Sequence, residues 1–200
     1  MKNMKLQEQY NKIVIPEMTK KFGYSSVMAV PKIKKIVVNC GFGKMVIGKS
    51  ASEREKAEEY IAQSIAAITG QKPSLNKAKK SIAAFKLREG MAVGASCTLR
   101  KKRMYDFLEK LIWVVLPRSR DFRGVEEKSM TSQGDITVGF KEYVPFPELK
   151  VEKEKGIFGL EVTISTTAKT KEEGAALLRL LGFPFKASAR EAEPKAKVER

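Results

Sequence analysis

The residues with the clearest chemical potential form one basic stretch, Gln71–Arg88. It contains six lysines and arginines and no aspartate or glutamate. The helix-stopping Gly70 precedes it and Pro73 lies near its start, so the stretch begins as a loop. Cations held at a defined place between two ordered elements suit a ligand with regularly spaced negative charge, and a phosphate backbone is the commonest such ligand. The alternative is a solvated lysine loop without a ligand.

A second motif, Gly43–Ser50, matches the phosphate-cradling P-loop pattern G-x-x-x-x-G-K-S and lies between a predicted strand and a predicted helix. In a working P-loop, backbone amides, Lys49 and the Ser50 hydroxyl would hold a nucleotide phosphate and its magnesium ion. Three features count against this interpretation. Residues 40–42 separate the strand from the motif, no apolar run ends in a magnesium-holding aspartate, and the chain lacks repeated strand–helix alternation.

The composition favours a polyanionic partner over catalysis. The chain has 200 residues and a formal net charge of +16, which favours nucleic acid first and an anionic membrane surface second. We expect no membrane span and no secretory signal, because no apolar run has the required length. The absence of histidine removes Ser-His and Cys-His mechanisms, and Cys40 and Cys97 are expected as reduced core thiols of a cytoplasmic protein. We predict no catalytic residue, no metal site and no cofactor.

Hydrophobic periodicity and capping signals predict the elements that must position these motifs. Helices are expected at residues 4–21, 52–69, 102–116 and 170–181. Pro16 should kink or restart the first, Ser52 and Glu55 should form a capping box on the second, and Pro117 should end the third. Strands are expected at residues 33–39, 82–87, 91–100, 136–141 and 158–166. Because strands often follow strands directly, we predict an α+β fold with a mainly antiparallel or mixed sheet, helices packed on it and a long projecting basic loop.

Two further features concern the C-terminal half. An arginine-rich turn contains Arg118, Arg120 and Arg123, and Asp121 could brace one arginine while the others reach phosphate. We predict one domain over residues 1–185 and a disordered tail over residues 186–200, because the tail has little to bury.

Ordered runs of residues over nearly all of positions 5–186 resemble the bacterial large-subunit ribosomal protein family that binds 5S rRNA, the L-five family. The runs are Phe22-Gly23-Tyr24, Val27–Pro31, Ile68–Pro73, Lys77–Ser81, Thr98–Arg100, Pro117–Gly124, Thr166–Lys169 and Gly182–Lys186. So many matches in order are far more specific than the P-loop motif, which falls where the family has a variable turn. Two departures are the loop Met130–Ile136, which lacks the family's Gly-rich aromatic pattern, and the tail beyond Lys186.

The resemblance implies a structural role in the central protuberance of the large ribosomal subunit. The implied partners are 5S rRNA, 23S rRNA, P-site tRNA, neighbouring large-subunit proteins and, across an inter-subunit bridge, a protein of the small-subunit head. The family's 5S rRNA-recognition cluster falls on Asn39, Gln71 and Thr98, with Lys32, Lys72 and Arg100 beside it. The tRNA-facing loop falls on residues 73–84, with contacts from Pro73, Asn76, Lys77, Lys79, Lys80 and Ser81. Arg118, Arg120 and Arg123 are candidates for other rRNA contacts.

Three hypotheses therefore make different predictions. A structural ribosomal protein predicts tight, salt-dependent binding to one folded RNA. A P-loop nucleotide-binding protein predicts ATP or GTP binding that is lost on Lys49→Ala. A nonspecific nucleic-acid binder predicts no preference for 5S rRNA over other RNAs.

Overall fold

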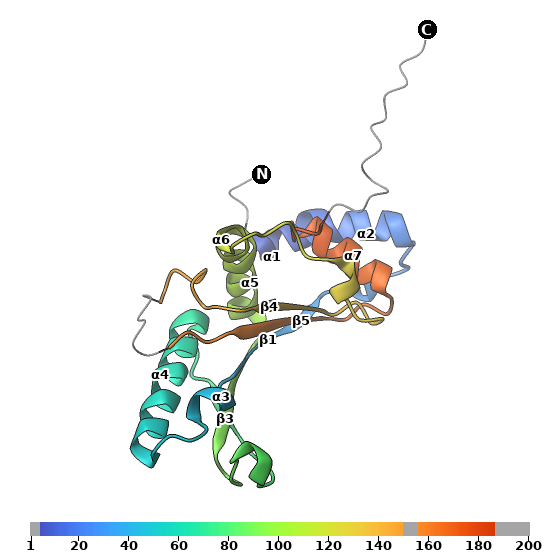
Figure 1. Cartoon of the computed structure of the whole chain (residues 1–200). Coiled ribbons are helices and arrows are strands. Elements are labelled where there is room, and N and C mark those ends of the chain that lie inside the picture. The colour runs from blue at the N-terminus through green and yellow to red at the C-terminus, as the bar shows by residue number, and fades with distance from the viewer. Residues whose placement is uncertain (1–4, 150–155, 187–200) are drawn as a thin grey trace.

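The computed structural model describes residues 5–149 and 156–186 (Figure 1). Its centre is a five-stranded sheet in the order β2-β3-β1-β5-β4. The strands are β1 (Ile33–Gly41), β2 (Ser74–Lys77), β3 (Ala92–Leu99), β4 (Ile136–Phe140) and β5 (Leu160–Thr166). The helices are α1 (Leu6–Gln9), α2 (Ile15–Phe22), α3 (Gly43–Val46), α4 (Ala51–Thr69), α5 (Lys101–Lys110), α6 (Leu116–Arg118) and α7 (Lys171–Leu180). The predicted α+β class is confirmed, and all pairings between these five strands are antiparallel.

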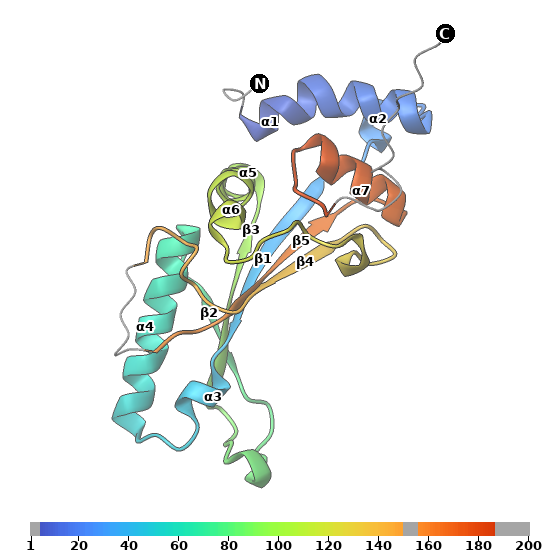
Figure 2. The same cartoon turned by 45° about the horizontal axis from the view of Figure 1, so that its top comes forward.

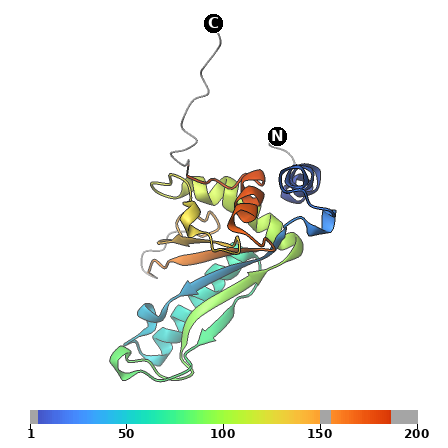
Figure 3. The ribbon, with the colours of Figure 1, turned by 90° about the vertical axis from the view of Figure 1, so that its right-hand side faces the viewer.

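The two faces of the sheet differ in what covers them. Along β1, Ile36 and Val38 are fully buried, whereas Val37 and Asn39 alternate with them and remain accessible. Helices supply the cover, since α4 packs against β3 and α5 packs against β1. Figure 3 shows α4 behind β1 and β3, while the near face of these strands carries no helix of the described chain. We call this uncovered side the open face of the sheet.

The strands β2 and β3 form a hairpin that projects away from the rest of the molecule (Figure 2). A 3-10 turn, Ala83–Phe85, and a bridge between Ile82 and Leu87 close its tip. The predicted strand at residues 82–87 is therefore wrong, and the strand that pairs with β3 is Ser74–Lys77. All four side chains of β2 are exposed, so its sequence has no alternating apolar pattern that would predict a strand. Backbone pairing with β3 holds this edge strand in place.

Two helices continue through a proline that was expected to interrupt them. A π-helical turn, Tyr10–Val14, joins α1 to α2 just before Pro16, and another, Leu111–Val115, joins α5 to α6 before Pro117. Proline cannot donate to the carbonyl four residues back, and its ring clashes with that carbonyl in a regular helix. A wider π turn relieves the clash. The first helix therefore continues through Pro16 by way of a π turn. Pro117 does not end the later helix, which runs to Arg118.

The long helix α4 is closed at both ends by side chains. Its capping box consists of Ser50 and Glu53, so the expected pair Ser52 and Glu55 is wrong by two residues. Both pairs have the S-x-x-E spacing. Ser50 is the N-cap because its backbone is extended and the helix begins at the next residue, whereas Ser52 already lies inside the helix. At the other end, Gly70 adopts φ +67 and Lys110 Nζ donates to the Ile68 carbonyl at 2.6 Å.

The loop that departs from the family pattern ties β5 to α7. Asp135 Oδ1 accepts from the Thr166 amide at 2.7 Å and Oδ2 accepts from the Ser165 hydroxyl at 3.1 Å. Gly134 packs directly on Gly174 of α7, where an added Cβ on Gly174 would lie 2.5 Å from Gly134 Cα. The loop therefore has a structural role in this chain.

The order of strands interleaves early and late parts of the chain. The early strand β1 lies between the later strands β3 and β5, so neither half of the sheet is complete without the other. The single domain over residues 1–185 stays a prediction. The predicted tail lies outside the described residues from position 187 onward.

Candidate nucleic-acid interface

Cross-strand pairing assembles small polar side chains on the open face. The register places Ser74, Ser96, Asn39, Glu161 and Gly139 in one row, and Thr98, Val37, Thr163 and Thr137 in the next. Six of the nine members, all except Val37, Gly139 and Glu161 with its carboxylate, carry a hydroxyl or an amide. Such groups, on a rigid sheet, can bond the 2′-hydroxyls and phosphate oxygens that a folded RNA displays. The open face is therefore chemically suited to recognising RNA shape.

Gln71 lies beside β3 at the end of α4. Its Nε2 donates to the Thr98 carbonyl at 3.4 Å, and its backbone amide donates to Thr69 Oγ1 at 3.3 Å. Thr69 is itself buried and donates back into the last turn of α4. The structure thus brings Gln71 against Thr98, and it places Asn39 on the adjacent strand with its side chain on the same face. Among the described residues, the side-chain oxygens of Asn39 and Thr98 have no hydrogen-bond partner, so both can bond a ligand.

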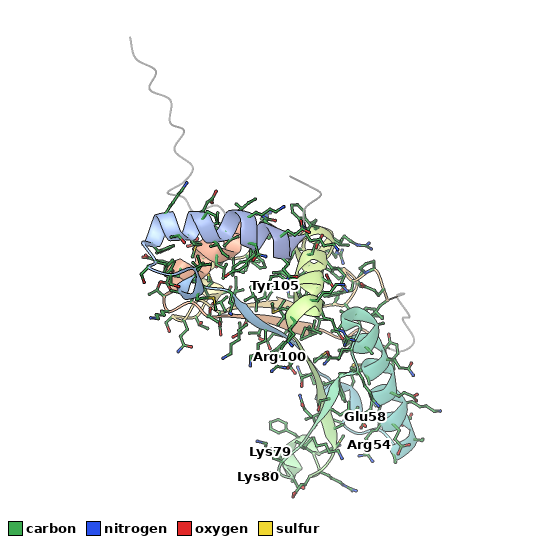
Figure 4. The ribbon with its side chains drawn as sticks, turned by 180° about the vertical axis from the view of Figure 1, so that it is seen from behind. Arg54, Glu58, Lys79, Lys80, Arg100 and Tyr105 are labelled. Carbon is green, nitrogen blue, oxygen red and sulfur yellow. The ribbon has the colours of Figure 1, made fainter. Side chains whose placement is uncertain are left out.

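Three predicted cations border the open face. Lys32 precedes β1 and pairs through its backbone with Thr167, Lys72 follows Gln71, and Arg100 links β3 to α5, as Figure 4 shows for Arg100. All three side chains are exposed. None forms an ion pair within the described part of the chain. Their positive charge is therefore available to phosphate.

The residues predicted to face tRNA divide into two groups. Lys79 and Lys80 lie exposed at the far end of the hairpin (Figure 4), and Lys77 is exposed at the end of β2. In contrast, Pro73 is buried, Asn76 accepts from Ser96 Oγ at 3.3 Å, and Ser81 Oγ accepts from the Glu89 amide at 2.9 Å. The lysines are thus free for a ligand, while the latter group shapes the hairpin.

The tip also presents residues that sequence reasoning missed. Phe85 is 64% exposed and Ile82 is 42% exposed, although both were assigned to a strand. Lys86 follows Phe85 with a left-handed φ of 49°, which turns the chain back toward β3. The many basic residues between positions 77 and 88 indicated an exposed tip. The apolar residues at positions 82–87, taken alone, favoured a strand.

The arginine-rich turn lies at a distance from the hairpin. Arg118, Arg120 and Arg123 are all exposed, and α6, which ends at Arg118, lies on the opposite side of the sheet from the hairpin tip in Figure 1. Asp121 adopts a φ of 55° and forms no ion pair with the three arginines, so the expected brace is wrong. The turn is instead fixed by its backbone, where the Val125 amide donates to the Pro184 carbonyl at 2.9 Å.

The P-loop motif does not form a phosphate cradle. The amides of Met45, Ile47 and Lys49 donate to carbonyls of the same turn. The Ser50 amide and hydroxyl both donate to Glu53 Oε2, at 2.9 and 2.7 Å. These hydrogen bonds lower the pKa of Glu53, so a carboxylate occupies the place that a nucleotide phosphate would need. The geometry gives no support to the nucleotide-binding alternative.

The titratable groups with shifted pKa values in the described part of the chain are explained by burial and by local hydrogen bonds. Burial raises the pKa of the Cys40 thiol to about 12, which makes it an unreactive core residue. The pKa of Glu173 is lowered although desolvation opposes this, because the Lys169 amide donates to its carboxylate. No group of acidic, cysteine or histidine side chains that could hold a metal ion occurs among the described residues. No helix in the described part of the chain is long and apolar enough to cross a membrane.

Comparison with known proteins matches both halves of the chain to the same protein family. Residues 26–88 match the family described as "Ribosomal protein L5", and residues 92–185 match the model of the C-terminus of the same ribosomal family. The chain is 52% identical over 181 residues to a "Large ribosomal subunit protein uL5" of Streptococcus pyogenes, covering 90% of this chain and 97% of that protein. A protein of the same name from Halothermothrix orenii is 47% identical over 180 residues, with the same coverage. One from Geotalea uraniireducens is 48% identical over 182 residues, covering 91% of this chain and 98% of the relative.

Proposed function

Since the chain belongs to the ribosomal protein L5 family and is a structural, non-enzymatic constituent of the large ribosomal subunit in the cytoplasm, we propose that its open face binds 5S rRNA. The observation that carries this proposal is that Asn39 and Thr98 lie on one uncovered polar surface, with Gln71 bonded to the Thr98 carbonyl. Rigid elements hold these side chains, so little conformational entropy is lost when RNA binds them.

The bordering cations give the contact its strength. Lys32, Lys72 and Arg100 can each neutralise a phosphate and release counterions, which positions the RNA without reading its sequence. The amide and hydroxyl groups between them then select a particular RNA shape. This division of roles predicts an interaction that is both salt-dependent and specific.

The remaining partners are assigned to other surfaces. The hairpin tip with Lys77, Lys79 and Lys80 contacts P-site tRNA. The contact is to phosphates, because tRNAs of different sequence must all be accepted at this site. Arg118, Arg120 and Arg123 contact 23S rRNA. A protein of the small-subunit head and neighbouring large-subunit proteins complete the set of partners. The projection of the hairpin and the exposure of these cations support this arrangement.

The proposal for 5S rRNA is tested by truncating side chains of the proposed site. We expect Gln71→Ala or Thr98→Ala to weaken 5S rRNA binding by about 1 kcal/mol or more, because each loses a hydrogen bond to a charged or buried partner. Filter binding at constant salt measures the change. Gln63→Ala is the matched control, because Gln63 is an exposed glutamine on α4 whose amide bonds Glu59 at 3.1 Å.

Thermal melting of each variant guards against a folding effect, since Gln71 also bonds β3. A variant that melts like the parent and binds 5S rRNA with unchanged affinity would contradict the assignment of this site.

A further inference from the structure

The P-loop-like segment lines a small basic cavity beside the tip of the hairpin. The cavity has a volume of about 300 Å³ and lies between the start of α4 and the chain returning from the hairpin tip. Four cationic side chains contribute to its walls: Lys49, Arg54, Lys86 and Arg88. Two come from each side, so the cavity joins the hairpin to α4.

These four charges have no acidic counterpart in the cavity. No described aspartate or glutamate lines it, and none of the four cations forms an ion pair with a described residue. Glu53 lies close enough for Lys49 to lower its pKa, but its carboxylate is already bonded to Ser50. Glu58 lies one turn beyond Arg54 on α4 and is not part of the lining (Figure 4). Like charges that converge in this way repel one another until an anion joins them.

We propose that this cavity binds phosphate groups of an RNA strand. Four cations exceed what one phosphodiester neutralises, whereas a strand brings one negative charge with each nucleotide. The other lining residues are Val46, Gly48, Ser50, Ala51 and Met91, so no aromatic ring is present to stack the base of a free nucleotide. Arg54 donates weakly to Met91 Sδ at 3.8 Å, which keeps its guanidinium at the wall of the cavity.

A bound strand would have a mechanical effect on the hairpin. Lys49 and Arg54 belong to the α4 side, and Lys86 and Arg88 belong to the hairpin, so a phosphate between them links the two elements. The hairpin tip would then be held in a fixed direction relative to the rest of the molecule. The site is distinct from the proposed 5S rRNA contact, because Asn39, Gln71 and Thr98 do not line the cavity.

The test uses the full chain with Lys86→Asn and Arg88→Gln combined. Lys86 has a left-handed backbone that asparagine adopts more readily than lysine, so the variant loses charge without a backbone cost. Backbone amide shifts in NMR spectra report binding of two separate probes, pyrophosphate and a hexauridylate RNA. The control combines Lys20→Gln with Lys21→Gln, which removes two lysines from α2, far from the cavity lining.

We expect both probes to shift amides of residues 48–54 and 86–91, with hexauridylate binding about tenfold more tightly or better because it offers more phosphates. The double variant should lose about tenfold in affinity for both probes, and the control should not. An absence of shifts at residues 48–54 and 86–91, or an unaffected double variant, would overturn the site. Equal affinity for pyrophosphate and hexauridylate would overturn the RNA strand as its ligand. The 5S rRNA titration is a separate measurement, so either proposal can fail alone.

Discussion

The chemistry of this protein at the residue scale depends on which polar atoms are left free. Gln71 Nε2 donates a hydrogen bond to the Thr98 carbonyl, and the side-chain oxygen of Gln71 remains available as an acceptor. A ribose 2′-hydroxyl could donate to this oxygen. In contrast, the amide and the hydroxyl of Ser50 both donate to the carboxylate of Glu53. Polar side chains therefore support RNA binding at one place and exclude nucleotide binding at another.

Cys40 permits a direct check of how closely the centre of the sheet is packed. Burial raises the pKa of its thiol to about 12, so the native protein at pH 8 should leave this cysteine protonated and unreactive. Cys97 is also buried, on the adjacent strand β3. We expect a disulfide reagent such as DTNB to modify neither thiol within minutes, and to modify both at once in urea. Rapid reaction of the native protein would show that β1 and β3 open readily.

Residue roles could be predicted from the sequence only in part. Asn39 and Thr98 were placed on one site by resemblance, and strand alternation explains why both are accessible. Ser74 and Ser96 were missed because their position beside Asn39 depends on strand register. Register between distant strands is set by tertiary packing and leaves no local signal.

At the scale of elements, the contact between Gly134 and Gly174 joins a loop to α7. We expect Gly174→Ala to lower the free energy of unfolding by about 1–3 kcal/mol, because the new Cβ meets backbone atoms that cannot move aside. Helix propensity works in the opposite direction and recovers about 1 kcal/mol at most. Urea unfolding measures the change. Gly139→Ala is the control, because nothing lies within 4 Å of its added Cβ; equal stability of the two variants would show that the loop does not pack on α7 in this way.

The hairpin carries a separate prediction as an element. Replacing Lys79 and Lys80 with glutamine should leave binding to isolated 5S rRNA unchanged, because both lie at the far tip of the hairpin (Figure 4). The same change should weaken tRNA binding to the P site of ribosomes that contain the variant, with each lost phosphate contact lowering the salt dependence. Competition between parent and variant ribosomes for labelled tRNA measures this. Loss of 5S rRNA binding would show that the hairpin is wrongly assigned.

Elements with strong local signals could be predicted, and those held by distant contacts could not. Helix α4 has a capping serine, an apolar stripe and a terminal glycine, and only its start was misplaced. The edge strand β2 has four exposed side chains and depends on β3 for its conformation. The π turns before Pro16 and Pro117 also could not be predicted from residue propensities. They depend on how the preceding turn of the helix adjusts to the proline ring.

The whole molecule separates its surfaces for different partners. One face of the sheet is buried under helices and the other remains polar and open, while the hairpin extends beyond both (Figures 1 and 3). A net charge of +16 draws any nucleic acid toward the protein. Charge alone gives no preference among RNAs, so specificity must come from the rigid polar groups on the open face.

The central claim is therefore that this protein recognises the fold of 5S rRNA in addition to its charge. A filter-binding titration at about 150 mM salt compares 5S rRNA with an unrelated RNA of the same length, under conditions that suppress much of the nonspecific binding. We predict a preference for 5S rRNA of about 10³-fold or more, within the range of specific nucleic-acid recognition. Equal affinity for the two RNAs would contradict the account, because it would reduce the open face to a nonspecific basic surface.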